Sequence, residues 1–281
     1  MKKIILTAVF AMSLSTYAQV KVPAASPKIE SEQVVGLTEI ELEYARPGVK
    51  GRTVFGDMIP YGQIWRTGAN ENTKISFSDD VIIGGNHLPK GEYALYTIPE
   101  KDSWTVIFYT DTKSWGVPQN WDDKKIALKV GAKLSPTDFT EYLTIAVNPI
   151  DNNSGELVIS WEKTKATVPF EVPTQKKALQ SIEKGLNAGT SSARDYFLAA
   201  QYLYTEDIEL KKAMEFIEQS VKMSDGETLF YVLRQKALIQ AKLGDKKGAI
   251  ETAQKSAEAA AKAGNEEYVR MNKQSINEWS K

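Results

Sequence analysis

The chain has 281 residues, of which 25% are charged, and a formal net charge of −1 at pH 7. This balance, without a clustered basic stripe, excludes a general surface for nucleic acid or anionic membranes. The sequence contains no cysteine, which excludes disulfides, thiolate nucleophiles, cysteine metal sites and an acylated lipoprotein cysteine together. A chain of this length can hold two domains, each with its own hydrophobic core.

The first residues have the order of a cleavable secretory signal peptide. Two lysines precede the apolar run Ile4–Leu14, and small residues occupy the two positions that a signal peptidase reads at and before Ala18. The run is shorter than the roughly 20 apolar residues of a membrane-spanning helix. We therefore expect residues 1–18 to be removed, leaving a secreted or periplasmic chain that begins near Gln19 and has no membrane span.

Residues 19–172 have the pattern of β structure. Between Leu37 and Tyr44 apolar residues alternate with three glutamates, the period of two expected of a strand with one face in water. Short segments rich in β-branched and aromatic residues follow, separated by turn sequences. About nine strands without an intervening helix pattern predict an antiparallel β-sandwich or jelly-roll-like barrel. The further predicted strands are Thr73–Phe77, Val81–Ile83, Glu92–Ile98, Trp104–Tyr109, Ile126–Val130, Glu141–Val147, Glu156–Trp161 and Ala166–Val172.

The hydrophobic period changes near Pro173. Beyond it the apolar residues fall at helical spacing, for example at Leu179, Ile182 and Leu186. This pattern predicts an all-α domain over residues 173–281, divided into about six helices of ordinary length. The predicted breaks lie at Gly189, Asp225-Gly226, Gly244-Asp245 and Gly264-Asn265.

The helical region contains one internal similarity. Aligning Lys212–Glu215 with Gly248–Glu251 also superposes Ser220 on Ser256, at a spacing near the 34-residue tetratricopeptide period. We therefore predict a tetratricopeptide-like helical repeat, although a helical bundle that happens to repeat once is an alternative. A stacked helical repeat presents a concave surface suited to extended segments, so we expect a protein partner there.

The segment from Arg46 to Phe77 places four of its five cations beside glycine-rich turns. Such turns expose backbone N–H groups that form anion-binding nests, and an arginine can hold a carboxylate or phosphate with two N–H groups. We predict a ligand pocket here, for an anionic small molecule or a glycan. Alternatively, the arginines bond to carbonyl groups and to acids such as Asp57, and so hold long loops in place. The candidate ligand-binding residues are Arg46, Lys50, Arg52, Arg66, Asn70 and Glu71.

The sequences RPGVKGR and WRTGANE in this segment resemble a known bacterial family, domain of unknown function 2911. The likeness continues through LPKGEYALYTIP and WTVIF and covers about residues 23–172. It implies a secreted all-β domain with no agreed activity, substrate or cofactor. Many members are expected to have Ser before the Arg-Pro pair and Asn after WTVIF, whereas this chain has Ala45 and Tyr109.

Aromatic side chains offer a second kind of recognition surface. Large amphipathic rings such as Trp65, Tyr93 and Tyr96 supply flat faces for sugar rings or peptide side chains. The alternation of Trp104 with Val106 and Phe108 instead predicts a core position for Trp104. Trp115 and Trp121 lie in the polar segment between Thr110 and Lys125, so we expect both to be exposed.

Signatures of catalysis and metal binding are weak. His87 is the sole histidine, and no G-x-S-x-G sequence accompanies it. Asp151, Asn153 and Gly155 resemble the start of a calcium loop, but Glu156 stands where such a loop needs glycine, so we expect a hairpin turn. Glycoside hydrolysis needs two carboxylates at a set separation, and no pair is identifiable. We predict no catalytic residue, no metal site and no cofactor.

These observations together predict a non-enzymatic secreted or periplasmic protein. Its β domain recognises a ligand or partner, and its helical repeat docks another protein. The alternative from a different class is a hydrolase acting on glycans or peptides, and a third possibility is a purely structural role. A cleft with buried carboxylates of shifted pKa favours the hydrolase, whereas a basic or aromatic surface favours binding.

Overall fold

The computed structural model describes residues 22–224 and 229–281. The chain divides into two compact units, one ending at Pro173 and the other beginning at Thr174. The signal peptide predicted over residues 1–18 lies outside the described residues. Among the helices of the two described stretches, none has both the length and the apolar character needed to cross a membrane.

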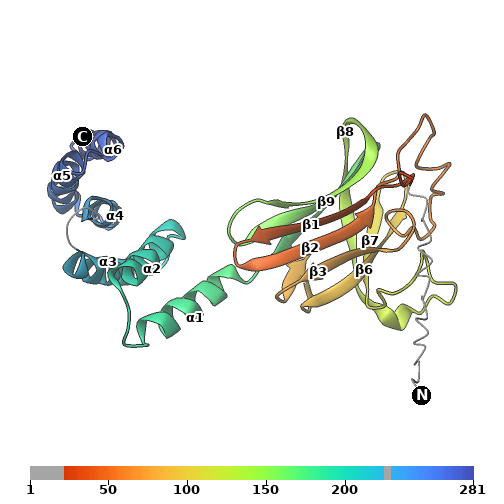
Figure 1. Ribbon diagram of the computed structural model, residues 1–281, viewed down its shortest axis with the longest axis horizontal. Helices are drawn as coiled ribbons and strands as arrows, with labels where there is room; N and C mark the ends of the chain where they lie inside the picture. The colour runs from red at the N-terminus through yellow and green to blue at the C-terminus, as the bar shows by residue number, and fades with distance from the viewer. Residues whose placement is uncertain (1–21, 225–228) are drawn as a thin grey trace, which may run out of the picture. The chain divides into compact units, whose positions relative to one another are not determined.

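The first unit contains an antiparallel sheet of nine strands, in the order β1-β2-β3-β6-β7-β8-β9-β4-β5 (Figure 1). The predicted antiparallel β region is therefore confirmed, although β1 and β5 were not among the predicted strands. The strands are β1 (Lys28–Val35), β2 (Thr38–Ala45), β3 (Thr73–Phe77), β4 (Val81–Ile83), β5 (Asn86–Leu88), β6 (Gly91–Pro99), β7 (Trp104–Tyr109), β8 (Ile126–Pro149) and β9 (Ser154–Glu171).

The hairpin of β8 and β9 is longer than the sequence predicted. Each of these strands contains two predicted strands and the segment between them. The register between β8 and β9 shifts twice, from Pro136 to Thr140 and from Thr140 to Thr144. The early part of β8 pairs with β7 and its later part with β9. The irregular strand β8 thus joins two halves of the sheet, the half from β1 to β7 and the half formed by β9, β4 and β5.

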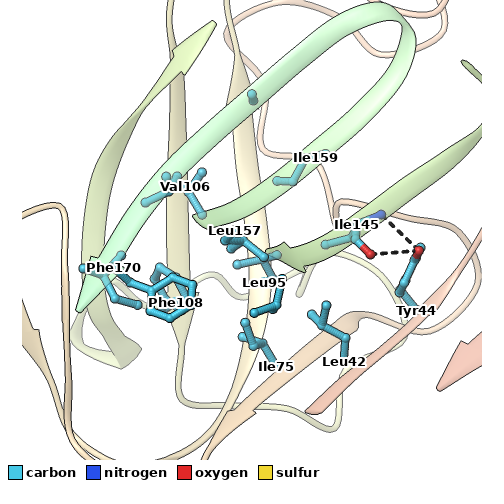
Figure 2. Packing of buried hydrophobic residues seen from close by; sticks show 14 of the residues in the cluster. Leu42, Tyr44, Ile75, Leu95, Val106, Phe108, Ile145, Leu157, Ile159 and Phe170 are labelled. Atoms are coloured by element: carbon cyan, nitrogen blue, oxygen red, sulfur yellow. Dashed lines mark hydrogen bonds between the residues drawn. The ribbon is translucent and has the colours of Figure 1, made fainter. Parts of the chain in front are cut away.

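Side chains from both halves of the sheet share one hydrophobic core (Figure 2). In β2, Leu42 and Tyr44 are buried while Glu39 and Glu41 are exposed, as the alternation predicted. The Tyr44 hydroxyl donates to the Ile145 carbonyl and accepts from the Ile145 N–H, each at 3.0 Å. These bonds, drawn in Figure 2, tie β2 to the later part of β8. The sheet is therefore curved, so that β1 and β2 contact β8.

A second, smaller cluster lies on the opposite face of β6 and β7. Trp121, from the loop between β7 and β8, packs there and stacks on Tyr109 with ring centroids 4.4 Å apart. The two strands are consequently buried on both faces. This packing fixes the β7–β8 loop, which includes Trp115 and Gly116, against the sheet. The buried members of the cluster are Ala94, Tyr96, Ile107 and Tyr109.

The second unit is helical, as predicted, and its described residues form six helices. The predicted break at Asp225-Gly226 falls outside the described residues. A turn at Glu206–Glu209 was not predicted, because it contains no glycine; Asp207 and Glu209 adopt left-handed backbone conformations there, with φ of 57° and 45°. The helices are α1 (Thr174–Leu186), α2 (Ala193–Thr205), α3 (Leu210–Met223), α4 (Leu229–Lys242), α5 (Lys246–Lys262) and α6 (Glu266–Trp279).

Consecutive helices pack mainly on their neighbours in the chain, most closely in the pairs α2–α3 and α4–α5. The aligned serines make equivalent bonds in the two pairs. Ser220 in α3 donates to the Ala193 carbonyl of α2 at 2.8 Å, and Ser256 in α5 donates to the Phe230 carbonyl of α4 at 2.6 Å. The internal similarity in the sequence thus corresponds to a repeated contact between paired helices.

Candidate functional site

The segment Arg46–Arg52 is held against β8 by hydrogen bonds. The Arg46 guanidinium donates to the Leu143 carbonyl and to Thr144 Oγ1, both at 2.8 Å. The Lys50 N–H donates to Glu141 Oε1 at 2.9 Å, with Lys50 in a left-handed conformation of φ 49°. Arg46 therefore acts as a strut between β2 and β8.

Arg52 closes the same turn on itself. Its guanidinium donates to the carbonyl of Val49 at 3.0 Å and to that of Gly48 at 2.6 Å. Gly48 has little room for a side chain, since a Cβ would lie 3.0 Å from Glu141 Oε1. The sequence RPGVKGR consequently folds into a turn with few free hydrogen-bonding groups on its backbone.

The segment Trp65–Asn72 lies along β6. Trp65 exchanges two backbone hydrogen bonds with Thr97, at 2.7 and 2.9 Å. Thr67 is fully buried in a left-handed conformation of φ 53°, and its carbonyl accepts from Thr73 Oγ1 at 2.8 Å. A Cβ on Gly68 would lie 2.8 Å from the same Oγ1, so only glycine fits there. The central Thr-Gly of WRTGANE thus has a packing role.

A cavity of about 540 Å³ opens between these two segments. Lys50, Arg52 and Arg66 line it, and none of the described residues around it is Asp or Glu. Trp65 and Trp161 also line it, and their rings stack with centroids 5.7 Å apart and planes 20° apart. The cavity therefore combines three cations with an aromatic wall.

Of these three cations, Arg66 alone has a buried polar atom that lacks a partner. Within the described part of the chain its guanidinium makes no hydrogen bond or ion pair, and its Nε is buried without a partner. The guanidinium packs on Gly116, where a Cβ would lie 2.9 Å from Nη1. Because Arg52 uses its N–H groups on carbonyls and Arg66 does not, Arg66 is the arginine better able to bind an anion.

Asn70 and Glu71 line a different cavity, of about 220 Å³. Asn72 and the exposed Trp115 line it as well. The two cavities share Ala69 but not the predicted polar residues. Of the six predicted site residues, the structure thus brings Lys50, Arg52 and Arg66 together, places Asn70 and Glu71 apart from them, and leaves Arg46 lining neither cavity.

Several other sequence-based expectations concern single residues. Trp104 is buried and Trp115 is 72% exposed, as expected, whereas the expected exposure of Trp121 is wrong because it stacks on Tyr109. Asp151 accepts hydrogen bonds from the Asn153 N–H and the Ser154 hydroxyl, both at 2.8 Å, in the turn between β8 and β9. Such bonds are those of a hairpin turn.

The pKa shifts in the β unit arise from burial or from local hydrogen bonds. Burial raises the pKa of Tyr96 to about 12, so its hydroxyl stays protonated and donates to the Gly116 carbonyl at 3.1 Å. His87 is exposed and lies 3.3 Å from Asp80, and the bond from the Lys90 N–H is the main cause of the lowered pKa of Asp80. In the described residues, every carboxyl group with a resolved shift has a lowered pKa.

Comparison with known protein families matches residues 26–170 to the family described as "Protein of unknown function (DUF2911)", just over half of the chain. The chain belongs to this family. No curated protein and no solved structure matches it. The matched residues include both segments that border the larger cavity, and they end before α1 begins.

Among the residues of the larger cavity that sequence reasoning missed are Trp161 and Gln63. Trp161 was assigned only as the end of a predicted strand, and Gln63 lies in a loop between Tyr61 and Trp65 without a local signal. Trp161 is 1% exposed overall, yet it borders the cavity and donates its Nε1–H to the Glu141 carbonyl at 3.2 Å. Its position at the inward-facing end of the Glu156–Trp161 alternation was the one available clue.

Proposed function

We propose that the β unit binds an anionic small molecule in the larger cavity. The observation that carries this proposal is the lining by Lys50, Arg52 and Arg66 without a carboxylate among the described lining residues. An unpaired guanidinium binds a carboxylate or phosphate through charge-assisted hydrogen bonds, which are about twice as strong as neutral ones. The wall of Trp65 and Trp161 suits an apolar or ring-shaped part of the same ligand.

Titration of the whole protein with inorganic phosphate, benzoate and glucuronate, followed by ligand-observed NMR, tests this proposal. Replacing Arg66 with Ala removes charge-assisted bonds of about 1.5–3 kcal/mol, so we expect binding to weaken about tenfold or more. The control Arg270→Ala removes an exposed arginine of α6 and leaves affinity unchanged. An affinity that is unchanged in Arg66→Ala, or that does not fall as the salt concentration rises, contradicts the proposal.

The alternative of a glycan or peptide hydrolase receives less support. A general acid in such an enzyme needs a carboxyl group whose pKa is raised towards neutral. The resolved carboxyl shifts in the described residues all lower the pKa, and the buried polar residues there include no Asp or Glu. The larger cavity is bordered by cations instead, which suits ligand binding.

We also propose a finer architecture for the two units and a location for the protein. A sandwich-like or jelly-roll-like β domain is supported by the shared core of the two sheet halves and by the bonds from Tyr44 to Ile145. A tetratricopeptide-like tail that docks a protein partner is supported by the matching bonds of Ser220 and Ser256. The leader-like order of residues 1–18 supports a secreted or periplasmic location.

Two fragments test whether these parts fold separately. We expect a fragment of residues 19–172 and a fragment of residues 174–281 each to show one cooperative thermal transition, since each unit has its own hydrophobic cluster. Circular dichroism follows both transitions. If the helical fragment were unfolded alone and folded only when the β fragment was added, the two parts would form a single cooperative unit.

A further inference from the structure

Four consecutive residues, Ala69–Asn72, line the smaller cavity, together with Trp115 and with Lys28, Glu43, Tyr44 and Ala45. In an extended strand, successive side chains point to opposite faces. Asn70 has a left-handed φ of 62°, which bends the backbone so that neighbouring residues border one cavity. The cavity holds about 220 Å³, less than the roughly 300–1,000 Å³ typical of sites for drug-sized ligands. It is therefore suited to a single ring.

Two polar side chains of this cavity, those of Asn70 and Glu71, have no partner among the described residues, and a third residue, Asn72, has an unpaired Nδ2. Asn72 is 3% exposed, and its Nδ2 has no hydrogen-bond partner among the described residues. Asn70 and Glu71 are exposed, and neither side chain makes a hydrogen bond or an ion pair with another described residue. A buried amide left unpaired is costly, and rotation of its terminal group presents either a donor or an acceptor to the cavity.

Trp115 adds a large apolar surface next to these polar groups. Its side chain is 72% exposed, although the neighbouring Gly116 is well anchored. The Gly116 carbonyl accepts from the Tyr96 hydroxyl at 3.1 Å, and Gly116 has a φ of 83° that favours glycine. The indole is thus held in water by a fixed turn, beside unpaired hydrogen-bonding groups.

The charges around the smaller cavity differ from those of the larger one. Lys28 bonds to Glu43 at 2.8 Å, and this bond lowers the pKa of Glu43, so the two charges offset each other. Glu71 leaves the border with one net negative charge. An anion is consequently disfavoured here, whereas a neutral ligand rich in hydroxyl groups can donate to the Glu71 carboxylate.

We propose that this cavity is a second binding site, which takes one neutral sugar ring. The apolar C–H face of the sugar packs on the Trp115 indole, its hydroxyl groups donate to the Glu71 carboxylate, and a ring or hydroxyl oxygen pairs with the Asn72 amide. This site does not rest on the anion-binding function, because the two cavities share only Ala69.

The test uses the full chain and four neutral sugars, namely glucose, galactose, mannose and N-acetylglucosamine, in saturation-transfer NMR. We expect at least one of them to bind. In that case Trp115→Ala and Glu71→Ala each weaken the affinity about tenfold, a factor that corresponds to the loss of one good contact. Phe139→Ala is the matched control, because Phe139 is also exposed, at 55%, but lies in β8 and does not line the cavity.

Three results overturn the proposal. One is that none of the four sugars binds; another is that binding survives Trp115→Ala and Glu71→Ala at full strength; the third is that Phe139→Ala weakens it equally. Thermal melts of each variant check the fold, and Trp115→Phe, which keeps a smaller ring, is expected to retain part of the affinity. Trp115→Ala is expected to bind phosphate, benzoate and glucuronate as before, so failure of this site is distinguishable from failure of the anion site.

Discussion

The segments Arg46–Arg52 and Trp65–Asn72 contain similar residues but differ in how their side chains are satisfied. In the first, Arg46 and Arg52 direct their N–H groups at carbonyl oxygens of the protein. In the second, the backbone is anchored to β6, yet Arg66 Nε and Asn72 Nδ2 are buried without a partner, and the side chains of Asn70 and Glu71 make no hydrogen bond with another described residue. Similar sequences thus form a braced turn and a segment with free binding groups.

This difference shows why a cluster of arginines and glycines is ambiguous evidence for a ligand site. An arginine that bonds to main-chain carbonyls stabilises a loop, and it has fewer N–H groups left for a ligand. A partly buried arginine without a partner makes no hydrogen bond that stabilises the fold, and its N–H groups remain available to an anion. The two roles make opposite predictions for stability, and matched substitutions in the two segments separate them.

The largest expected effect is that of Arg46→Ala. It leaves the carbonyl of the fully buried Leu143 without its partner, so we expect the free energy of unfolding of the β unit to fall by about 1–3 kcal/mol. Arg66→Ala removes no hydrogen bond within the described protein, and we expect a change within about 0.5 kcal/mol. Urea denaturation followed by tryptophan fluorescence measures both, since every tryptophan except Trp279 precedes Pro173.

If Arg46→Ala and Arg66→Ala lowered the free energy of unfolding equally, the two segments would not differ, because both arginines would then hold loops in place. In that outcome Arg66 would have a structural partner, and the anion site would lose its main residue. Arg46→Lys is a useful intermediate, since one ammonium group can reach one of the two acceptors but cannot reproduce the forked geometry of the guanidinium.

A smaller contrast is expected between two glutamates. Glu141 Oε1 accepts from the Lys50 N–H at 2.9 Å and so supports a left-handed turn, whereas the exposed Glu71 makes no such bond. We expect Glu141→Ala to lower the free energy of unfolding by about 0.5–1.5 kcal/mol, and Glu71→Ala to change it by no more than about 0.5 kcal/mol. Glu141→Gln keeps an acceptor, so a loss as large as that of Glu141→Ala would argue against this bond.

Much of the fold was predictable wherever burial on one face imposes a period on the sequence. Thr73–Phe77, Val81–Ile83 and Trp104–Tyr109 match β3, β4 and β7 at both ends. β1 (Lys28–Val35) was missed because it is an edge strand with exposed polar side chains, so no alternation marks it. β8 was divided in two because its register shifts interrupt the alternation around Thr140.

The candidate site was predictable in composition but not in arrangement. The sequence pointed to the right segments, but the partner of Arg46 lies 97 residues further along the chain, at Leu143. No local pattern distinguishes that arginine from Arg66, whose guanidinium packs on Gly116 of the β7–β8 loop. The separation of Lys50 and Arg52 from Asn70 and Glu71 into two cavities likewise depends on how distant segments meet.

The smallest loss of stability is expected for Asn72→Leu, which removes a buried amide whose Nδ2 has no partner among the described residues. Leucine has a similar shape and no group to desolvate, so we expect the free energy of unfolding to stay the same or to rise by up to about 1 kcal/mol.

The matched control is Asn272→Leu in α6. Asn272 is also fully buried, but its Nδ2 donates to Ser256 Oγ and to the Tyr268 carbonyl, both at 2.8 Å. For Asn272→Leu we expect the free energy of unfolding to fall by about 1–3 kcal/mol. Circular dichroism of the helical unit measures this loss. A loss of that size in Asn72→Leu would mean that the protein itself already satisfies this amide, and Asn72 would then have no free group to offer a ligand.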